Sequence, residues 1–451
     1  MDKKERSNFS GKLGFVLAAA GSAVGLGNIW RFPYLAAKYG GGIFLLVYLV
    51  LAVTFGFTLL VAEISIGRKT GLSAVGAFKS LKSKYSFIGY IESIVPMIIL
   101  PYYCVIGGWV VKYFVEFVKF NEMTATDEFF GQFVSQPAEP LVWFLIFLAL
   151  TAIVVILGVE KGIEKVSKIM MPILIVLSLF IAGYSLFLPG AMAGVKYYLL
   201  PDFGNFSVTT VLAAMGQLFY SMSLAMGIMI TYGSYMKKDV NIESSVRQIE
   251  IFDTGIAFLA GLMIIPAVFA FSGGDEAALG KGPGLMFVTL PKVFESMTGG
   301  SFVGILFFVL VLFAALTSSI SLMEAVVSII QDRFKTKRGI TIAITLGICF
   351  LLGIPSSLGN GIWSKFTIIG MDFLTFFDFI SNSVIMPVVA FLTCIFVGYV
   401  IKPSAVEDEV AINGKFMSKK LFSVMIKYIA PVCIVLILVS SVLEAMGIMK
   451  I

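Results

Sequence analysis

The chain has 451 residues, of which 59% are hydrophobic and only 13% are charged, and its mean hydropathy is +0.98. Soluble domains carry about 25% charged residues, so this composition excludes a soluble globular class. The formal net charge of +6 comes from lysines and arginines in loops and requires no nucleic-acid partner, and the absence of histidine excludes histidine-based metal sites and catalytic triads.

Long apolar segments occur along the whole chain, and each is long enough to cross the ~30 Å hydrocarbon core of a bilayer as a helix. We count eleven, centred near residues 24, 54, 102, 149, 178, 223, 259, 316, 347, 388 and 437. The sequence therefore predicts an all-α polytopic membrane protein with eleven transmembrane helices.

The lysines and arginines alternate between loops in a way that predicts orientation. They are frequent in residues 1–10 and after the second, fourth, sixth, eighth and tenth segments, and sparse in the loops between. Because cytoplasmic loops carry the excess of positive charge, residues 1–10 are expected in the cytoplasm. An odd number of spans then places the C-terminus outside the cell membrane.

The first apolar segment contains an irregularity at Gly21–Asn28, which is followed at once by Trp30–Pro33. Three glycines and an asparagine make a poor lipid-facing helix. Backbone that leaves helical geometry in a bilayer must be buried in protein or line a wet cavity, because each unpaired polar group costs several kcal/mol there. A broken helix with freed carbonyls beside an asparagine is typical of a cation site.

The sixth segment, Gln217–Gly227, shows a second interruption with two serines and a glycine, and it opens a second block of five segments. Two broken helices in matching positions indicate an inverted-repeat transporter with a site near the middle of the membrane. The alternative is that Ser221 and Ser223 bond to their own helix and that the glycines serve helix packing.

Further polar groups lie within apolar segments. Asp253 is an intramembrane carboxylate, and such a group is a functional hypothesis because leaving it charged and unpaired costs ~2.5 kcal/mol or more. Ala314–Ser319 presents three consecutive hydroxyls, although a helix-packing seam explains that run equally well. Carbonyl, hydroxyl, amide and carboxylate oxygens suit a hard cation, and with so few carboxylates Na⁺ fits better than Ca²⁺.

These motifs closely resemble the neurotransmitter:sodium symporter family, in particular its eleven-span bacterial amino-acid members. The signature Gly21–Pro33 is very specific, and the similarity continues through Glu63, Tyr102–Tyr103, the sixth segment and Leu316–Ser319. The resemblance implies a five-plus-five inverted repeat with helices 1 and 6 broken. We expect residues 1–10 as a cytoplasmic segment, 11–190 and 205–400 as the two repeats, and 420–448 as the eleventh helix.

The resemblance also implies two sodium sites as the cofactors. The first would comprise Ala23, Asn28, Ser221 and Asp253, together with the carboxylate of the substrate. The second would comprise Gly21, Val24, Ala314, Thr317 and Ser318. A substrate that supplies an oxygen to the ion binds poorly without it, so substrate and sodium are expected to raise each other's affinity.

Two positions depart from the usual pattern of the family, which has threonine and asparagine where this chain has Ser221 and Asp253. The serine keeps the oxygen, and the aspartate adds a negative charge beside the first sodium site. Chloride-dependent relatives obtain that charge from a bound anion, so we expect no chloride requirement. Protonation of Asp253 on the empty return step, giving proton antiport, is a hypothesis.

The expected substrate is a neutral, hydrophobic or aromatic L-amino acid, with small neutral amino acids as the alternative. Gly25 stands where amine-carrying relatives have an aspartate, so an α-carboxylate fits against the first sodium. The predicted binding residues are Ala23, Gly25, Gly27, Ile99, Tyr103, Ile106, Tyr220, Ser221, Ser223, Met226, Ser318 and Leu322. A cation channel is the alternative class. A membrane enzyme is excluded because no nucleophile–base pair appears.

Gates are implied on both sides of the site. Arg31 and Asp378 resemble an external charge pair, with Asp372 as a competing partner and with Tyr103 and Tyr220 as a lid beneath. The cytoplasmic gate would comprise Arg6, Phe9, Asp332 and Tyr235, and Phe9 replaces the usual tryptophan of the family. Helices 1, 2, 6 and 7 would rock against the rest. Whether the protein is a monomer or a homodimer is left open.

Overall fold

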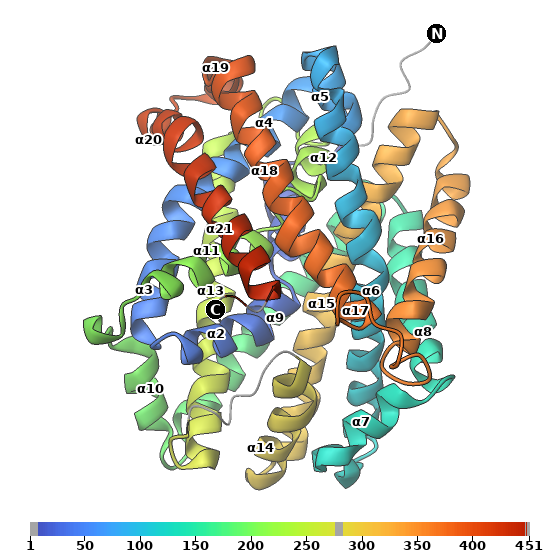
Figure 1. The fold of residues 1–451 in the computed structure, drawn as a ribbon, viewed down its shortest axis with the longest axis vertical. Helices are drawn as coiled ribbons and strands as arrows, with labels where there is room; N and C mark the ends of the chain where they lie inside the picture. Colours follow the sequence, from blue (N-terminus) through green and yellow to red (C-terminus); the bar gives the residue numbers. More distant parts are fainter. Residues whose placement is uncertain (1–7, 276–282, 447, 449–451) are drawn as a thin grey trace.

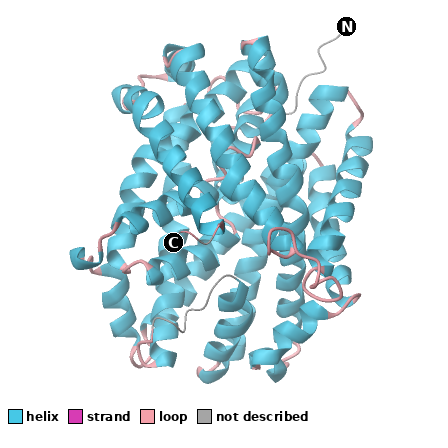
Figure 2. Ribbon diagram, in the orientation of Figure 1, coloured by secondary structure: helices cyan, strands magenta, loops and turns pink. Residues whose placement is uncertain are grey.

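The computed structural model describes residues 8–275, 283–446 and 448, and within them the chain is helical, with only isolated β-bridges such as Gly41 to Pro201. Figure 2 shows the helices joined by short loops. Arg6 of the predicted cytoplasmic gate lies outside the described residues. The all-α class is confirmed for the described part of the chain.

The first half begins with a bent pair of helices, and most of the long helices of the molecule run roughly along the vertical axis of Figure 1. Its helices are α1 (Lys12–Ala23), η1 (Gly27–Arg31), α2 (Phe32–Lys38), α3 (Gly42–Leu51), η2 (Ala52–Gly56), α4 (Phe57–Thr70), α5 (Ala74–Leu81), η3 (Ser83–Tyr85), α6 (Ser86–Val118), η4 (Glu122–Ala125), α7 (Asp127–Ser135), α8 (Glu139–Ile156), η5 (Val159–Glu164), α9 (Lys165–Leu186), α10 (Ala191–Leu199) and η6 (Phe203–Asn205).

The second half begins with α11 and α12, which are separated by a non-helical segment. Its helices are α11 (Val208–Ser221), α12 (Ile228–Ser234), α13 (Ile242–Ser272), η8 (Leu285–Thr289), α14 (Leu290–Ser296), α15 (Gly300–Phe334), α16 (Arg338–Leu358), α17 (Phe373–Asp378), η9 (Phe379–Ile385), α18 (Met386–Ile395), η10 (Phe396–Val400), α19 (Ser404–Val410), η11 (Ala411–Asn413), α20 (Lys419–Val424), η12 (Met425–Ile429) and α21 (Ala430–Ala445).

Nine helical spans in the described residues are long and apolar enough to cross a membrane, and the bent pair Lys12–Ala23 with Gly27–Lys38 makes a tenth. The predicted sixth span does not qualify as one helix, because Val208–Ser221 and Ile228–Ser234 are each short. The described residues thus give ten spans, and the predicted total of eleven is reached only if Val208–Ser221 and Ile228–Ser234 together form one interrupted span. The count of eleven stays a prediction.

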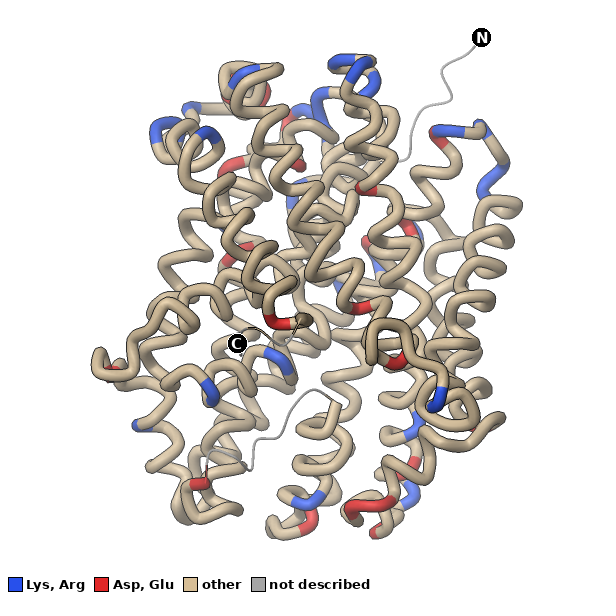
Figure 3. The backbone as a smooth tube through the Cα atoms, in the orientation of Figure 1, with Lys and Arg blue, Asp and Glu red and all other residues tan. Residues whose placement is uncertain are grey.

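Lysine and arginine gather along the edge of the molecule from which the N-terminal trace leaves, around α5, α19 and α20 (Figure 3). The opposite edge carries a mixture of acidic and basic residues. This separation agrees with the charge pattern from which we predict a cytoplasmic N-terminus.

The breaks lie in the centre of the bundle because long helices surround them. The helix α1 packs against α9, α13 and α15, and α15 packs in turn against α6, α8 and α9. Within α1 every residue from Gly14 to Ala23 is buried. A helix that is apolar all round and buried on every side lies inside the bundle rather than against lipid.

Candidate functional site

The first break lies between α1 and η1, whose axes differ by 55°. Val24 is extended, with φ −71° and ψ 101°, so the helix cannot continue through it. The Asn28 side chain then closes the gap, because its Oδ1 accepts a hydrogen bond of 3.0 Å from the Gly25 amide. The carbonyls that precede this turn have lost their helical partners and are free to face other groups.

The second break spans residues 222–227, between the end of α11 and the start of α12. Ser223, Ala225 and Gly227 all have positive φ, at 52°, 56° and 69°. For the two non-glycine residues this conformation costs roughly 1–2 kcal/mol each. Two buried carboxyl groups stabilise it, because Glu63 accepts from the Ala225 amide at 2.8 Å and Glu92 accepts from the Gly227 amide at 2.9 Å.

Three of the four predicted residues of the first sodium site, Asn28, Ser221 and Asp253, form one buried cluster, and the fourth, Ala23, lines the adjoining cavity. Asn28 donates from Nδ2 to Asp253 Oδ1 at 2.7 Å and to Ser221 Oγ at 3.0 Å. Ser221 Oγ donates to the same Asp253 oxygen at 2.8 Å, and Tyr48 donates to the other at 3.4 Å. The structure thus brings η1, α11 and α13 together through polar side chains, with Tyr48 of α3 as a member that the sequence did not identify.

The predicted residues of the second sodium site also meet, at the end of α1. Ser318 Oγ lies 3.2 Å from the Val24 carbonyl, 3.1 Å from the Ser22 carbonyl and 3.5 Å from the Gly21 carbonyl. Thr317 donates to the Ala314 carbonyl at 3.1 Å. A side chain at Gly21 would begin 3.2 Å from Thr317 Cβ, so glycine permits this close approach.

Both clusters have a donor set that fits a monovalent hard cation. They offer carbonyl, hydroxyl, amide and carboxylate oxygens, the ligands that such ions prefer. Within the described residues no group of three or more His, Cys, Asp or Glu side chains is placed to hold a metal. The single carboxylate of the first cluster, Asp253, is too little negative charge for a divalent ion.

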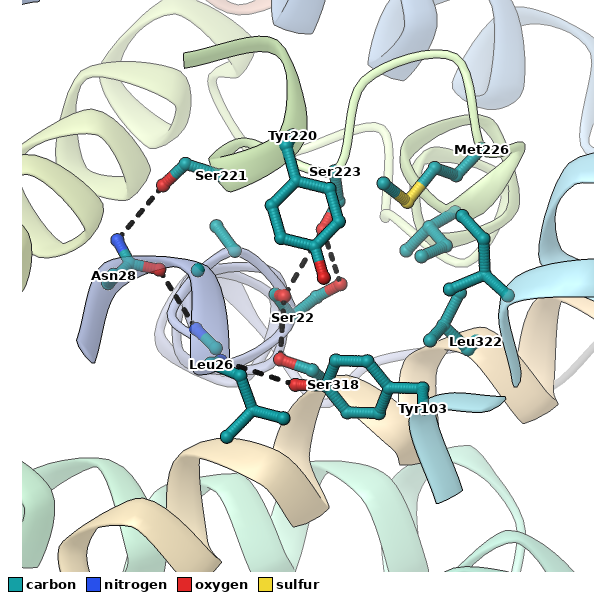
Figure 4. A pocket seen from close by; sticks show the side chains of 15 residues that line it. Ser22, Leu26, Asn28, Tyr103, Tyr220, Ser221, Ser223, Met226, Ser318 and Leu322 are labelled. Atoms are coloured by element: carbon teal, nitrogen blue, oxygen red, sulfur yellow. Dashed lines mark hydrogen bonds between the residues drawn. The ribbon is translucent and has the colours of Figure 1, made fainter. Parts of the chain in front are cut away.

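A cavity lies between the two breaks (Figure 4). Of the predicted binding residues, all except Ile106 line it. The lining residues are Ser22, Ala23, Gly25, Leu26, Gly27, Asn28, Ile99, Tyr103, Tyr220, Ser221, Ser223, Met226, Ile228, Ser318 and Leu322. Ser22, Leu26 and Ile228 were not predicted. Ser22 could have been identified, because it is a polar residue within the signature Gly21–Pro33, whereas Leu26 and Ile228 are ordinary apolar residues.

The floor of the cavity is a cluster of serine hydroxyls. Ser22 shares a hydrogen bond of 2.6 Å with Ser321, and Ser223 donates to the Ser22 carbonyl at 3.1 Å. Figure 4 shows Ser22 between Ser223 and Ser318, with Met226 and Leu322 on the far side. One end of the cavity is therefore polar and the other apolar.

Three of the predicted external gate residues, Arg31, Tyr220 and Asp378, line a larger vestibule that also contains Ile106, whereas Tyr103 lines the cavity. The Arg31 guanidinium lies 5.4 Å from the centre of the Tyr220 ring, and Asp378 accepts from Tyr102 and Asn382. Arg31 and Asp378 are thus both in the vestibule but form no ion pair within the described residues.

Two predictions for this side need correction. Ile106 faces the vestibule rather than the cavity. It lies three residues further along α6 than Tyr103, which shifts it by about 4.5 Å along the helix axis toward the vestibule. Asp372 is the N-cap of α17, where it accepts from the Thr375 amide at 3.0 Å. Asp378 lines the vestibule together with Arg31, whereas Asp372 does not, and the pairing of Arg31 with Asp378 stays a prediction.

The side predicted to face the cytoplasm is closed around Phe9, which is 1% exposed. Its ring packs edge-on against Tyr232 at 5.5 Å and Tyr235 at 6.1 Å, and its amide donates to the Tyr235 carbonyl. Tyr235 donates to Glu324 rather than to Asp332, which accepts from the Ser73 amide and hydroxyl. Tyr235 and Asp332 are thus each held by their own partner in this closed conformation.

The fold, with two broken helices around a central cavity, is that of a membrane transporter. The model of the sodium:neurotransmitter symporter family matches residues 6–126 and 132–449, so the chain belongs to this family. The predicted family and its transporter, rather than enzymatic, character are confirmed.

Similar proteins agree with this assignment. The chain is 37% identical to the uncharacterized sodium-dependent transporter YhdH of Bacillus subtilis (strain 168), over 98% of this chain and 99% of the relative. It is 32% identical to an uncharacterized sodium-dependent transporter of Haemophilus influenzae, over 98% and 99%. The crystal structure of MhsT in complex with L-phenylalanine has a TM-score of 0.88 at 38% identity, covering 97% of this chain and 100% of that one. The chain is therefore a sodium-dependent transporter with the inverted-repeat fold of the family.

Proposed function

We propose that this protein imports a neutral, hydrophobic or aromatic L-amino acid together with sodium, by alternating access. The observation that carries the proposal is the cavity between the two breaks. None of its lining residues is charged, and two oxygen clusters adjoin it through Ser221 and Ser318. A neutral ligand with one polar end is the ligand that such a cavity fits.

The carboxylate of the substrate would lie at the polar end. A Cβ at Gly25 would meet Ser318 Oγ at 2.7 Å and Tyr103 OH at 3.1 Å, so this position leaves no room for an amine-binding aspartate. The Tyr103 hydroxyl accepts from the Leu26 amide at 3.3 Å and has its proton left to donate. The carboxylate would then complete the first sodium site, which links ion and substrate binding.

The side chain of the substrate would lie against Ile99, Met226, Ile228 and Leu322. These residues are buried and apolar, and methionine adapts to side chains of different shapes. MhsT, which shares the fold at 38% identity, was crystallised with L-phenylalanine, and this supports an aromatic or aliphatic substrate here.

Two sodium ions and no chloride are proposed as the coupling ions. Asp253 supplies a fixed negative charge beside the first cluster, bonded to Asn28 and Ser221. The human taurine transporter, 28% identical over 88% of this chain, is described as sodium- and chloride-dependent. In the present protein the carboxylate would take over the function of the anion.

The proposed topology follows the charge pattern. Residues 1–10 and the charged edge of Figure 3 would face the cytoplasm, and the vestibule would face the outside of the cell membrane. Residues 11–190 and 205–400 would form the two repeats, with 420–448 as the last helix. The described conformation has an open vestibule above Tyr220 and a closed inner side at Phe9.

The test is uptake of labelled tryptophan, tyrosine, leucine and alanine into proteoliposomes under an inward sodium gradient, with chloride present or replaced by gluconate. We expect saturable uptake of the larger apolar amino acids that needs sodium and not chloride. Potassium in place of sodium is the control. Preference for alanine would favour the small-substrate alternative, and no uptake of any neutral amino acid would refute the proposal.

A further inference from the structure

Two buried carboxyl groups from different helices hold the second break at alternate amides. Glu63 on α4 accepts from the Ala225 amide at 2.8 Å, and Glu92 on α6 accepts from the Gly227 amide at 2.9 Å. Their exposed fractions are 1% and 0%. Met226, which lines the cavity, is the residue between these two amides.

If both Glu63 and Glu92 were ionised, the local backbone would compensate for only part of their negative charge. Alternating residues of positive φ, as at Ser223, Ala225 and Gly227, turn successive N–H groups toward a common anion. In the described residues each carboxyl receives one amide hydrogen through Oε1, and the Oε2 atoms of Glu63 and Glu92 have no hydrogen-bond partner. The amides that the two carboxyl groups accept from are only two residues apart in the chain, so Glu63 and Glu92 approach the same short loop.

No cation balances the pair. Among the described residues neither carboxyl forms an ion pair, and a charge without a counter-ion is strongly disfavoured at this depth. Charged groups on α4 and on the elements packed against α4 and α6 include three ion pairs, Arg68 with Glu409, Glu250 with Arg247 and Glu324 with Arg338. Asp253 accepts from Asn28 and Ser221, and Asp378 accepts from Tyr102 and Asn382. Cys394 and Tyr232 are a thiol and a phenol.

We propose that Glu63 and Glu92 form a proton-binding site and share one proton between them. One carboxylate is stabilised by the converging amides, while the other is kept neutral by the proton, which it takes from water. The orphaned Oε2 atoms are the positions between which this proton lies. Two like carboxyl groups at one buried site titrate as a pair and do not both ionise.

The pair connects this proton to the substrate cavity. Loss of the proton places two negative charges on one short loop, which separates Glu63 from Glu92 and moves the amides on either side of Met226. The helix α4 belongs to the second span, which is expected to rock, and α6 belongs to the third span, which is expected to stay fixed. The carboxyl pair therefore also bridges the moving and the fixed parts of the transporter. Substrate affinity should therefore fall as the proton is lost.

Infrared spectroscopy of the purified protein tests the site without any substrate. We expect the carbonyl band of a protonated carboxylic acid at neutral pH, and we expect either Glu92→Gln or Glu63→Gln to remove the same component. Each glutamine keeps an oxygen for the loop amide, and the remaining carboxyl no longer needs the proton. Glu116→Gln, on the same helix α6 but paired with Lys112, is the matched control and should leave that component unchanged. An unchanged band in both variants, or loss in only one, overturns the shared proton.

Substrate binding against pH tests the connection to the cavity, and this arm depends on the proposed function. At saturating sodium, one proton required by the bound state weakens affinity about tenfold per pH unit above its titration. We expect this slope in the wild type and in Glu116→Gln but not in Glu92→Gln. Equal slopes in all three overturn the coupling. If the wild type binds no amino acid at any pH, the proposed function fails, while the infrared measurement still decides the proton site.

Discussion

Replacing Asp253 by asparagine tests the proposed ion chemistry most directly, because it removes a charge and keeps the shape of the side chain. Asp253 Oδ1 accepts from Asn28 at 2.7 Å and from Ser221 at 2.8 Å. The single oxygen of the new amide side chain can still accept both hydrogens. The variant therefore changes the electrostatics of the first sodium cluster more than its geometry.

The magnitude follows from the charge that is removed. At an effective dielectric constant of about 20, two opposite unit charges roughly 8 Å apart attract each other by about 2 kcal/mol, and the asparagine loses this attraction for the ion. A change of about 2 kcal/mol corresponds to roughly a 30-fold loss of affinity. We expect Asp253→Asn to need about 30-fold more sodium for half-maximal uptake in chloride-free medium, and we expect added chloride to restore part of this loss.

The assay is sodium-dependent uptake into proteoliposomes with chloride or gluconate outside. Asp202→Asn is the matched control, because Asp202 is exposed and only caps a short turn at Gly204. It should leave the sodium requirement unchanged. If Asp253→Asn keeps chloride-free uptake at the wild-type level, the carboxylate does not stand in for an anion, and the explanation of chloride independence is wrong.

Three further predictions concern the cavity and its inner seal. Gly25→Ala places a Cβ 2.7 Å from the Ser318 hydroxyl. In binding assays, the affinities for substrate and for sodium should both fall by roughly tenfold or more. Gly183→Ala is the control and should change neither affinity, because its Cβ meets nothing within 4 Å. Tyr103→Phe removes a donor to the substrate carboxylate, which should weaken substrate binding by roughly 10- to 150-fold, and wild-type affinity would exclude this contact. Phe9→Ala empties a buried ring position, so thiol labelling of cysteines placed below the cavity should become faster, and an unchanged rate would show that Phe9 is no seal.

The sequence predicted the parts of the site that depend on local composition. Glycine, asparagine and serine inside apolar segments are costly, and that cost located both breaks and the residues Asn28, Ser221 and Asp253. The exact extent of the second break was not predictable, because α11 continues through Ser221 before it ends. Residues 222–227 are set by tertiary contacts with Glu63 and Glu92 rather than by their own propensities.

Other features depend on distances that no pattern contains. Ile106 and Tyr103 lie on nearly the same face of α6, yet one faces the vestibule and the other the cavity, because Tyr220 lies between these spaces. The Arg31–Asp378 pair depends on the conformation of the transporter. Glu92, in contrast, carried a readable signal, since it is a carboxylate within an apolar helix.

In the proposed mechanism, the coupling between substrate and sodium would come from residues that belong to both the cavity and an ion cluster. Ser221 lines the cavity and donates to Asp253, and Ser318 lines the same cavity and contacts the Val24 carbonyl. A substrate that fixes these two hydroxyls also fixes oxygens of both ion clusters. The loss of side-chain freedom that one ligand causes therefore does not have to be repeated when the other ligand binds. Such shared ordering gives coupling of about 1–3 kcal/mol, or roughly 5- to 150-fold, and it acts equally in both directions. Helical backbone has no free carbonyls to share in this way, and therefore the coupling requires the helices to be broken where the substrate binds.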